Sequence, residues 1–302
     1  MLKRSLAAVA LLGAGAAWWL TAPTPLSHAT ETALMTVPAD HIQGEQVFWA
    51  AGCASCHVAP GAEEGDAPLL AGGQAFASDF GTFYAPNISP SEQGIGGWTL
   101  LEFANAVQAG VSPDGAHYYP AFPYTAYAKA TPADIAALYA FMQTLPLDAT
   151  PSKAHDVGFP FNIRRSLGGW KLLFGAPTGP AVAADDPVLQ RGAYLTEALA
   201  HCTECHTERN ALGGLNTDRW LAGAPNPNGK GRIPNITPAG LDWSDIDLMA
   251  YFTTGLTPDY DSAGGHMASV VQNLARLSEE DRMAIVDYLK AIPAVADQSS
   301  DP

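Results

Sequence analysis

Four cysteines and two histidines of this chain form two copies of one short pattern. CASCH lies at residues 53–57 (motif 1) and CTECH at residues 202–206 (motif 2). On a helical turn this spacing lets two thiols bond the two vinyl groups of one porphyrin, while the adjacent imidazole reaches the iron from the same side. We therefore predict two covalently bound haem c groups, with thioether bonds from Cys53, Cys56, Cys202 and Cys205 and with His57 and His206 as the proximal iron ligands.

Cysteine pairs of this kind are compatible with other chemistry. In an exported protein, four cysteines ordinarily indicate disulfides. A single C-x-x-C can be a thiol redox motif or half of a zinc site. Two copies that each end in histidine and leave no cysteine unused favour haem over these alternatives.

Each iron is expected to take a second axial ligand, and in the second half of the chain the candidate is Met267. It follows a glycine-rich stretch in GGHMASVV, which suits a ligand loop. Thioether coordination is common in c-type haem proteins and raises the reduction potential. Met249 and Met283 lie in apolar helical patterns and are expected in the core. His266 is a competing neighbour, but we favour Met267.

The first half departs from this pattern. When the predicted helix ends at Gly110 and Gly255 are aligned, Phe122 falls at the position of Met267, and phenylalanine cannot coordinate iron. His117 lies in the same loop, so we infer that it is the axial ligand there; the alternative is an ordinary loop histidine. The other histidines are assigned to the surface or to the propionate side: His41, His155 and His201.

The two halves of the chain repeat each other beyond the motifs. PNISP at residues 86–90 recurs as PNITP at residues 234–238. Trp-Thr and Trp-Ser steps each open a helical pattern that ends in glycine. A final helix is predicted in each half, at residues 131–145 and 278–292, with capping sequences TPAD and SEED. The sequence therefore predicts an all-α fold with two similar helical domains in tandem.

Domain boundaries follow from the repeat and from composition. A chain of 302 residues that is 47% hydrophobic can bury about two cores. We place the domains at residues 38–148 and 187–293, with a connector at 149–186 and a flexible tail at 294–302.

The connector contains the aromatic and basic stretch FPFNIRRSLGGWKLLFG. We favour an ordered segment packed across both domains over a segment dedicated to partner docking. Arg164, Arg165 and Lys171 could equally neutralise haem propionates.

The N-terminus combines a basic start, MLKR, with an apolar run over residues 6–20. This pattern indicates an export signal. Residues 27–29, Ser-His-Ala, offer a cleavage site, whereas the run nears the length of about 17 residues that spans a bilayer and carries Trp18 and Trp19 at its outer end. We expect residues 1–29 to be a signal peptide or a membrane anchor, and favour the anchor. The rest is expected in the periplasm, held at the inner membrane if the anchor is retained.

The charge balance limits the partners. The chain has 15 basic and 30 acidic residues and a formal net charge of −15. Nucleic acid is excluded as a partner because phosphate binding needs clustered lysine and arginine. The acidity favours a positively charged partner or serves solubility alone.

Taken together, the chain resembles the membrane-associated multihaem cytochrome c subunits of periplasmic quinoprotein and molybdenum dehydrogenases, such as alcohol dehydrogenase. The resemblance rests on FGTFYAPNISP, YYPAFPYTAY, FPFNIRR and HCTECHTERNALGG, among other stretches that cover nearly the whole chain after the N-terminal segment. It implies class I-like cytochrome c domains, with short helices around a covalently bound haem. Relatives often have three haem domains and read YPAMPY, whereas this chain has two motifs and reads YPAFPY.

The main hypothesis is an electron carrier rather than an enzyme, and the resemblance alone does not transfer a dehydrogenase partner. A periplasmic dehydrogenase would be the donor, and a cytochrome or oxidase the acceptor. Methionine ligation raises the potential, so electrons are expected to pass from haem 1, bound at motif 1, to haem 2, bound at motif 2. The alternative is a dihaem enzyme of the peroxidase or thiosulfate dehydrogenase type with catalysis at haem 1, which would need an open iron position there. An inert anchor or assembly subunit is a third reading.

Overall fold

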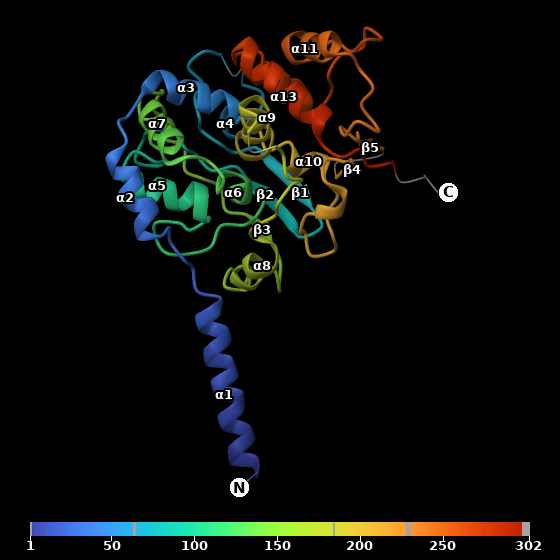
Figure 1. Cartoon of the computed structure of the whole chain (residues 1–302). Coiled ribbons are helices and arrows are strands. Elements are labelled where there is room, and N and C mark those ends of the chain that lie inside the picture. The colour runs from blue at the N-terminus through green and yellow to red at the C-terminus, as the bar shows by residue number, and fades with distance from the viewer. Residues whose placement is uncertain (1, 63–64, 184, 228–230, 298–302) are drawn as a thin grey trace.

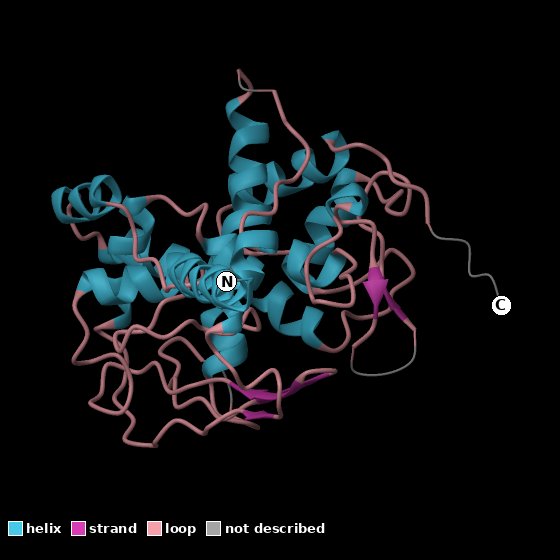
Figure 2. Cartoon of the chain, turned by 90° about the horizontal axis from the view of Figure 1, so that it is seen from below, coloured by secondary structure: helices cyan, strands magenta, loops and turns pink. Residues whose placement is uncertain are grey.

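The computed structural model describes residues 2–62, 65–183, 185–227 and 231–297. Residues 298–302 of the predicted tail lie outside the described residues. Helices fill the centre of the body, and the strands lie toward its periphery (Figure 2). The first helix projects away from the body (Figure 1).

The helices fall into a first and a second series along the chain, with one helix between them. The first series is α1 (Leu2–Leu20), α2 (His28–Thr36), α3 (His41–Ala50), α4 (Cys53–His57), α5 (Leu100–Ala104), the π-helix η1 (Asn105–Ala109), α6 (Tyr124–Tyr127) and α7 (Pro132–Met142). The intervening helix is α8 (Ser166–Phe174). The second series is α9 (Pro187–Ala193), the π-helix η2 (Tyr194–Leu199), α10 (Thr203–His206), the 3-10 helix η3 (Thr217–Arg219), α11 (Asp245–Thr254), α12 (His266–Leu274) and α13 (Glu279–Ala291).

The prediction of a mostly helical fold is confirmed, but it missed two small sheets. One is antiparallel, in the order β1 (Ala75–Ser78), β2 (Gly81–Tyr84), β3 (Asp156–Val157). The other pairs β4 (Ala224–Pro225) with β5 (Arg232–Ile233). Strand β3 comes from the predicted connector, so its pairing with β2 joins segments far apart in sequence, and no local pattern indicates it.

Helices α5 and α11 begin and end where the sequence predicts. Thr99 caps α5 and Ser244 caps α11, each in a capping box with an acidic residue three positions later. The ends fall at Gly110 and Gly255, which take left-handed backbone conformations with φ of 58° and 79°. Helix α5 reaches Gly110 only through the π-helix η1, which the sequence did not reveal.

A close helix crossing closes each series. Helix α3 packs on α7, and α9 packs on α13. At each crossing a glycine faces a backbone carbonyl: a Cβ on Gly44 would overlap the oxygen of Ala137, and one on Gly192 that of Ala284. Both crossings therefore depend on the absence of a side chain.

The connector packs against both halves of the chain, as predicted. Arg164 Nε donates to the carbonyl of His117 (2.8 Å), and Lys171 Nζ donates to the carbonyls of Ala109 (2.6 Å) and Gly110 (2.8 Å). Trp170 Nε1 donates to the carbonyl of Leu212 in the second half (2.9 Å). Helix α8 is thus an ordered part of the body.

Lys171 makes the stability of the folded protein depend on pH. Burial lowers the pKa of Lys171 from 10.5 to about 8. Between these values the unfolded chain binds more protons than the folded one, so the free energy of unfolding rises as pH increases from about 8 to about 10.5. Below pH 8 both states are protonated, and the cost of burying the charge is fully present. We expect Lys171→Met to lack this rise.

The measurement is the melting temperature of both proteins across that pH range. The melting temperature of wild type should rise relative to that of Lys171→Met as pH increases, because only wild type loses a buried charge. Lys153→Met, at an exposed lysine, is the control for a general effect of removing one ammonium group. Parallel curves for wild type and Lys171→Met would contradict the prediction.

Among the residues that the structure describes, none of the helices combines the length and the apolar character that crossing a membrane requires.

Candidate haem sites

Motif 1 forms the short helix α4. Gly52 precedes it in a left-handed conformation (φ 62°), which turns the chain from α3 into the motif. Cys53 is partly buried and Cys56 is exposed. Burial raises the pKa of the Cys53 thiol to about 12, and the neighbouring Cys56 adds to this.

Motif 2 forms α10 in the same way. The position of Gly52 is taken by His201, which also has a positive φ (39°) although it is not glycine. Cys202 is partly buried and Cys205 is exposed. Burial raises the pKa of Cys202 to about 12, again with a contribution from the second cysteine.

Both proximal histidines are held by the repeated proline sequence. Nδ1 of His57 lies 2.8 Å from the carbonyl oxygen of Pro86, and Nδ1 of His206 lies 2.8 Å from that of Pro234. A carbonyl only accepts hydrogen bonds, so Nδ1 carries the proton in each ring and Nε2 keeps its lone pair. Burial lowers the pKa of both histidines, which favours the neutral ring.

The main chain repeats this arrangement around each ring. The amides of Gly72 and Gly223 donate to the carbonyls of His57 (2.6 Å) and His206 (2.8 Å). The sequence showed the PNISP and PNITP repeat but not its purpose, which is to supply a carbonyl at a fixed distance from each histidine.

These residues fit a covalently attached haem. None of the four cysteines, all of which the structure describes, is in a disulfide. Each pair lies on one helical turn beside an imidazole whose outer nitrogen is available to a metal. The residues that would hold the groups are those predicted: Cys53, Cys56, Cys202 and Cys205 by thioether bonds, and His57 and His206 at iron. Haem c supplies one-electron redox chemistry when bound.

The loops that follow Gly110 and Gly255 share backbone contacts in the register that the sequence alignment predicts. Val111 and His117 form an isolated antiparallel bridge, and Leu256 and Ser262 form its counterpart. The next residue in each loop donates its amide to the glycine that ends the preceding helix, at 2.8 Å in both halves. In this register Phe122 takes the position of Met267, and His117 takes that of Ser262.

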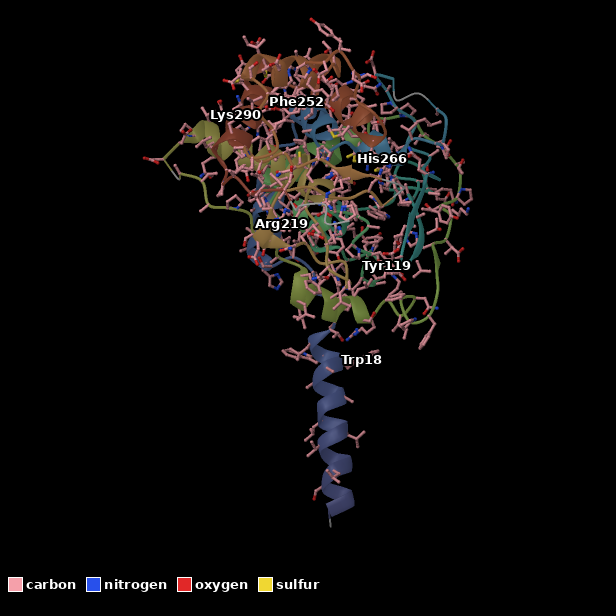
Figure 3. The ribbon with its side chains drawn as sticks, turned by 90° about the vertical axis from the view of Figure 1, so that its right-hand side faces the viewer. Trp18, Tyr119, Arg219, Phe252, His266 and Lys290 are labelled. Carbon is pink, nitrogen blue, oxygen red and sulfur yellow. The ribbon has the colours of Figure 1, made fainter. Side chains whose placement is uncertain are left out.

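Met267 is the second residue of α12 rather than part of a loop, and it is half-buried. Its neighbour His266, the competing candidate, stacks on Phe76 of β1 with ring centroids 6.3 Å apart. His266 lies on the side of the molecule shown in Figure 3. Its contact with Phe76 holds the ring against β1, and Met267 stays the predicted ligand.

His117 is buried, and its environment was not predicted. Its Nε2 lies 3.0 Å from the carbonyl oxygen of Thr21, just after α1. Its Nδ1 has no hydrogen-bond partner among the described residues. Burial lowers the pKa of His117, and three nearby basic side chains act in the same direction. Axial coordination would use Nδ1 or would require Nε2 to leave Thr21.

Comparison with known proteins identifies the family. The cytochrome c family model matches residues 42–146. The chain is 51% identical to a protein named dihaem cytochrome c-type from Cereibacter sphaeroides, over 97% of this chain and 100% of that protein. The chain belongs to the cytochrome c family.

This cytochrome is also similar to subunits of dehydrogenases. It is 42% identical to the fructose dehydrogenase cytochrome subunit of Gluconobacter japonicus, over 84% of this chain and 53% of that subunit. It is 35% identical to the alcohol dehydrogenase (quinone) cytochrome c subunit of Gluconobacter oxydans, over 84% of this chain and 55% of that subunit. The chain thus spans about half the length of these two relatives, and the predicted resemblance to such subunits is confirmed.

In this cytochrome each motif contacts the other half of the chain. Nδ2 of Asn273 in α12 donates to Oγ of Ser55 in motif 1 (2.7 Å). Oγ1 of Thr125 in α6 donates to Oε1 of Glu204 in motif 2 (3.2 Å). Ser55 and Glu204 are the third residues of their motifs, so the two contacts are reciprocal.

The backbones beside the two motifs are linked through one tyrosine. The hydroxyl of Tyr127 donates to the carbonyl of Ala51 (2.9 Å), and its ring lies 5.5 Å from that of His201. His201 and His155, which the sequence assigned to the surface or the propionate side, are half-buried in ring contacts, whereas His41 is exposed. No sequence pattern marked the reciprocal contacts, because each rests on single polar residues.

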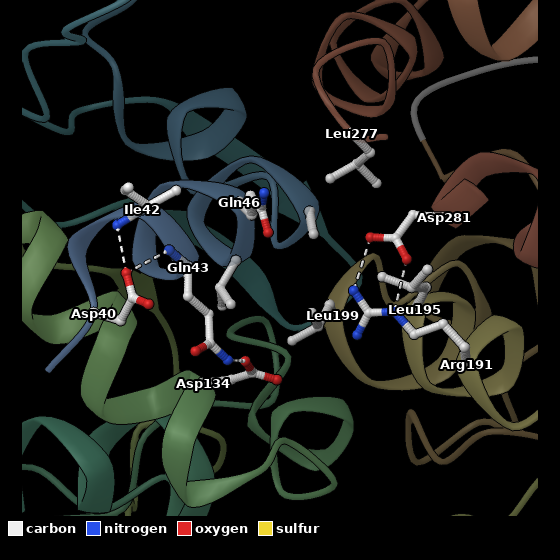
Figure 4. A pocket seen from close by; sticks show the side chains of 12 residues that line it. Asp40, Ile42, Gln43, Gln46, Asp134, Arg191, Leu195, Leu199, Leu277 and Asp281 are labelled. Atoms are coloured by element: carbon white, nitrogen blue, oxygen red, sulfur yellow. Dashed lines mark hydrogen bonds and ion pairs between the residues drawn. The ribbon is translucent and has the colours of Figure 1, made fainter. Parts of the chain in front are cut away.

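A pocket of about 320 Å³ lies between the helices that precede the two motifs and the helices packed on them (Figure 4). Its lining comes from α3, α7, α9, η2 and α13 and from residues that flank them. Arg191 and Asp281 form a two-pronged ion pair at its edge, with distances of 2.7 and 2.8 Å. Asp134 accepts hydrogen bonds there from Gln43 and Tyr194. These contacts tie the two helix crossings to each other.

Proposed function

We propose that this cytochrome binds two haem c groups and transfers electrons from a periplasmic dehydrogenase to a downstream cytochrome or terminal oxidase. The observation that carries the proposal is the duplicated geometry of the motifs. Each has a cysteine pair on one turn and an imidazole whose Nδ1 is held 2.8 Å from a proline carbonyl. Both sites are therefore prepared to hold an iron in the same way.

The relatives support a dehydrogenase as the donor. Two of them are named as cytochrome subunits of fructose dehydrogenase and of quinone-type alcohol dehydrogenase. The net charge of −15 also suits a partner with a positive docking face, through long-range steering. We propose that the chain is exported and that it holds one haem in each of two tandem domains, at residues 38–148 and 187–293.

The residues of the two sites have separate tasks. His57 and His206 bind iron through Nε2, while the prolines behind them fix the ring orientation. Met267 provides a thioether at the second site, which favours a higher potential there. The reciprocal contacts of Ser55 and Glu204 keep the two sites in a fixed relation.

A potentiometric titration of the purified haem-loaded protein, followed by absorption spectra, tests the proposal. We expect two one-electron steps, with the higher potential assigned to the second site through a Met267→Ala variant that lowers it. Stopped-flow mixing with a reduced quinoprotein dehydrogenase should then reduce both haems. Haem that stays oxidised during dehydrogenase turnover would overturn the proposed function, and a higher potential at the first site would overturn the direction of transfer.

His117→Ala tests the inferred ligand at the first site. If His117 coordinates iron, the variant should lose one low-spin ferric signal in electron paramagnetic resonance and gain a high-spin one. Phe122→Met is the matched variant, because it restores a thioether at the position equivalent to Met267. Combined with His117→Ala, it should recover a low-spin site. An unchanged low-spin spectrum for His117→Ala would exclude His117 as the ligand.

One observation favours a second candidate function. Nε2 of His117 is bonded to Thr21 in the structure, and an iron without this ligand would have an open position. That is the requirement of the dihaem enzyme alternative, of peroxidase or thiosulfate dehydrogenase type. Turnover of hydrogen peroxide or thiosulfate by wild type, abolished by His57→Ala, would support it, and a low-spin first site would exclude it.

A further inference from the structure

The body of the molecule exposes an apolar surface where α1 leaves it. Five apolar side chains of the segment around α8 are exposed, and we call them the collar: Phe159, Phe161, Ile163, Leu172 and Leu173. The largest exposed fractions are 81% for Phe159 and 71% for Leu173. Helix α8 lies at the base of the body, beside the end of α1 (Figure 1).

Helix α8 is fastened to the end of α1. The guanidinium of Arg165 stacks 4.1 Å from the ring of Trp18 and donates hydrogen bonds to the Trp18 carbonyl and to Thr21 Oγ1. Gly168 allows this approach, because a Cβ there would overlap the carbonyl of Thr21. Trp18 lies at this junction in Figure 3. Helix α8, which carries Leu172 and Leu173 of the collar, therefore lies against the end of α1.

The side chains of α1 that the structure describes are exposed, including that of Trp18, which contacts Arg165. Exposed fractions reach 74% at Leu11 and Leu12 and 76% at Trp19. A helix that is apolar on all sides is covered by a protein core or by lipid. The described residues supply no such core around α1, so the medium that covers it must be apolar.

The charges around this surface select a lipid bilayer with anionic headgroups. The chain carries 30 acidic residues, yet residues 1–30 and 157–184 contain none. These two acid-free stretches contact each other beside the collar, where Arg165 meets Trp18 and Thr21. The rest of the acidic surface would be repelled by such headgroups, whereas the charged side chains of these two stretches are all basic. Aromatic side chains such as Trp18, Trp19 and Phe159 are also typical of the headgroup layer.

We propose that the collar is a lipid-binding surface that lies on an anionic membrane, with α1 entering the apolar layer next to it. The proposal assigns the contact to the body of the protein as well as to α1. It is independent of the electron-transfer function, because no haem-site residue belongs to the collar.

Flotation of the full-length haem-loaded protein with vesicles of phosphatidylcholine and phosphatidylglycerol in equal amounts tests the proposal. Leu172→Gln with Leu173→Gln changes two exposed side chains. We expect this double variant to lower the vesicle partition coefficient about tenfold. The matched control is Ile246→Gln with Tyr260→Gln, which changes residues that are 80% and 89% exposed outside the collar. The control should partition like wild type.

Several outcomes would overturn the proposal. One is unchanged flotation of the collar variant, which would leave α1 as the sole lipid contact. Another is a dimer seen by light scattering in wild type but not in the collar variant, which would make a second copy the occupant. A third is normal flotation with slower reduction by the dehydrogenase, which would make the collar a protein docking surface. Dithionite reduction of both haems in the variant shows that the sites are intact, so failure of the electron-transfer function is recognised separately.

Discussion

Replacing Cys202 and Cys205 together by alanine is expected to remove about half of the covalently bound haem from the purified protein. The two motifs have matching geometry and lie on separate turns, so loss of one cysteine pair leaves the other able to form both thioether bonds. The pyridine haemochrome absorbance per mole of protein measures the covalent haem directly. The remaining haem should still be reducible by dithionite.

The matched variant is Cys53→Ala with Cys56→Ala, which should give the same halved content. A variant without one haem also lacks the core contacts that this haem would make. The haem content of both variants is therefore measured on soluble, monodisperse protein. Full haem content in either variant would disprove attachment at that motif. Loss of all haem in one variant, with the protein still folded, would show that the chain attaches a single group.

Gly192→Ala is expected to destabilise the folded protein by about 3 kcal/mol, since the added Cβ would overlap the carbonyl oxygen of Ala284 at the crossing of α9 and α13. The overlapping atom belongs to the backbone, so the crossing must open rather than a side chain rotate. Gly44→Ala should act similarly at the crossing of α3 and α7. Denaturant unfolding followed by circular dichroism measures the change in the free energy of unfolding.

Gly97→Ala is the control for the general effect of adding a methyl group. A Cβ at Gly97 would meet nothing within 4 Å, and its φ is not in the left-handed region. We expect it to change the free energy of unfolding by less than about 1 kcal/mol. Equal effects of Gly97→Ala and Gly192→Ala would show that the crossings tolerate a side chain.

Local signals predicted the helical turns of the two motifs and much of the helical framework. Both C-x-x-C-H turns and the capped starts of α5 and α11 depend on residues within one or two turns of each other, so spacing alone reveals them. The equivalence of Phe122 and Met267 followed from aligning two glycine helix ends; the matching bridges show the same register as far as His117 and Ser262.

Contacts between distant residues could not be predicted in this way. The hydrogen bond between His117 and Thr21 joins a loop to the end of α1, and neither residue type indicates the other. Strand β3 was hidden because two residues carry no periodic pattern. The carbonyls of Pro86 and Pro234 were hidden for a different reason: the repeat was visible, but a backbone acceptor leaves no mark in residue type.

The reciprocal contacts of the two motifs have a consequence for how such a chain can arise. In each half the third motif residue accepts a hydrogen bond from the helix after the opposite ligand loop. The two donors are three positions apart in the shared register, since Thr125 corresponds to Val270, so the arrangement resembles, without matching residue for residue, the isologous interface that joins identical subunits across a two-fold axis. A single ancestral repeat would have carried both complementary surfaces and paired with its own copy. Joining the two copies end to end then permits each surface to diverge, as Ser55 and Glu204 have done, while the pairing itself is kept.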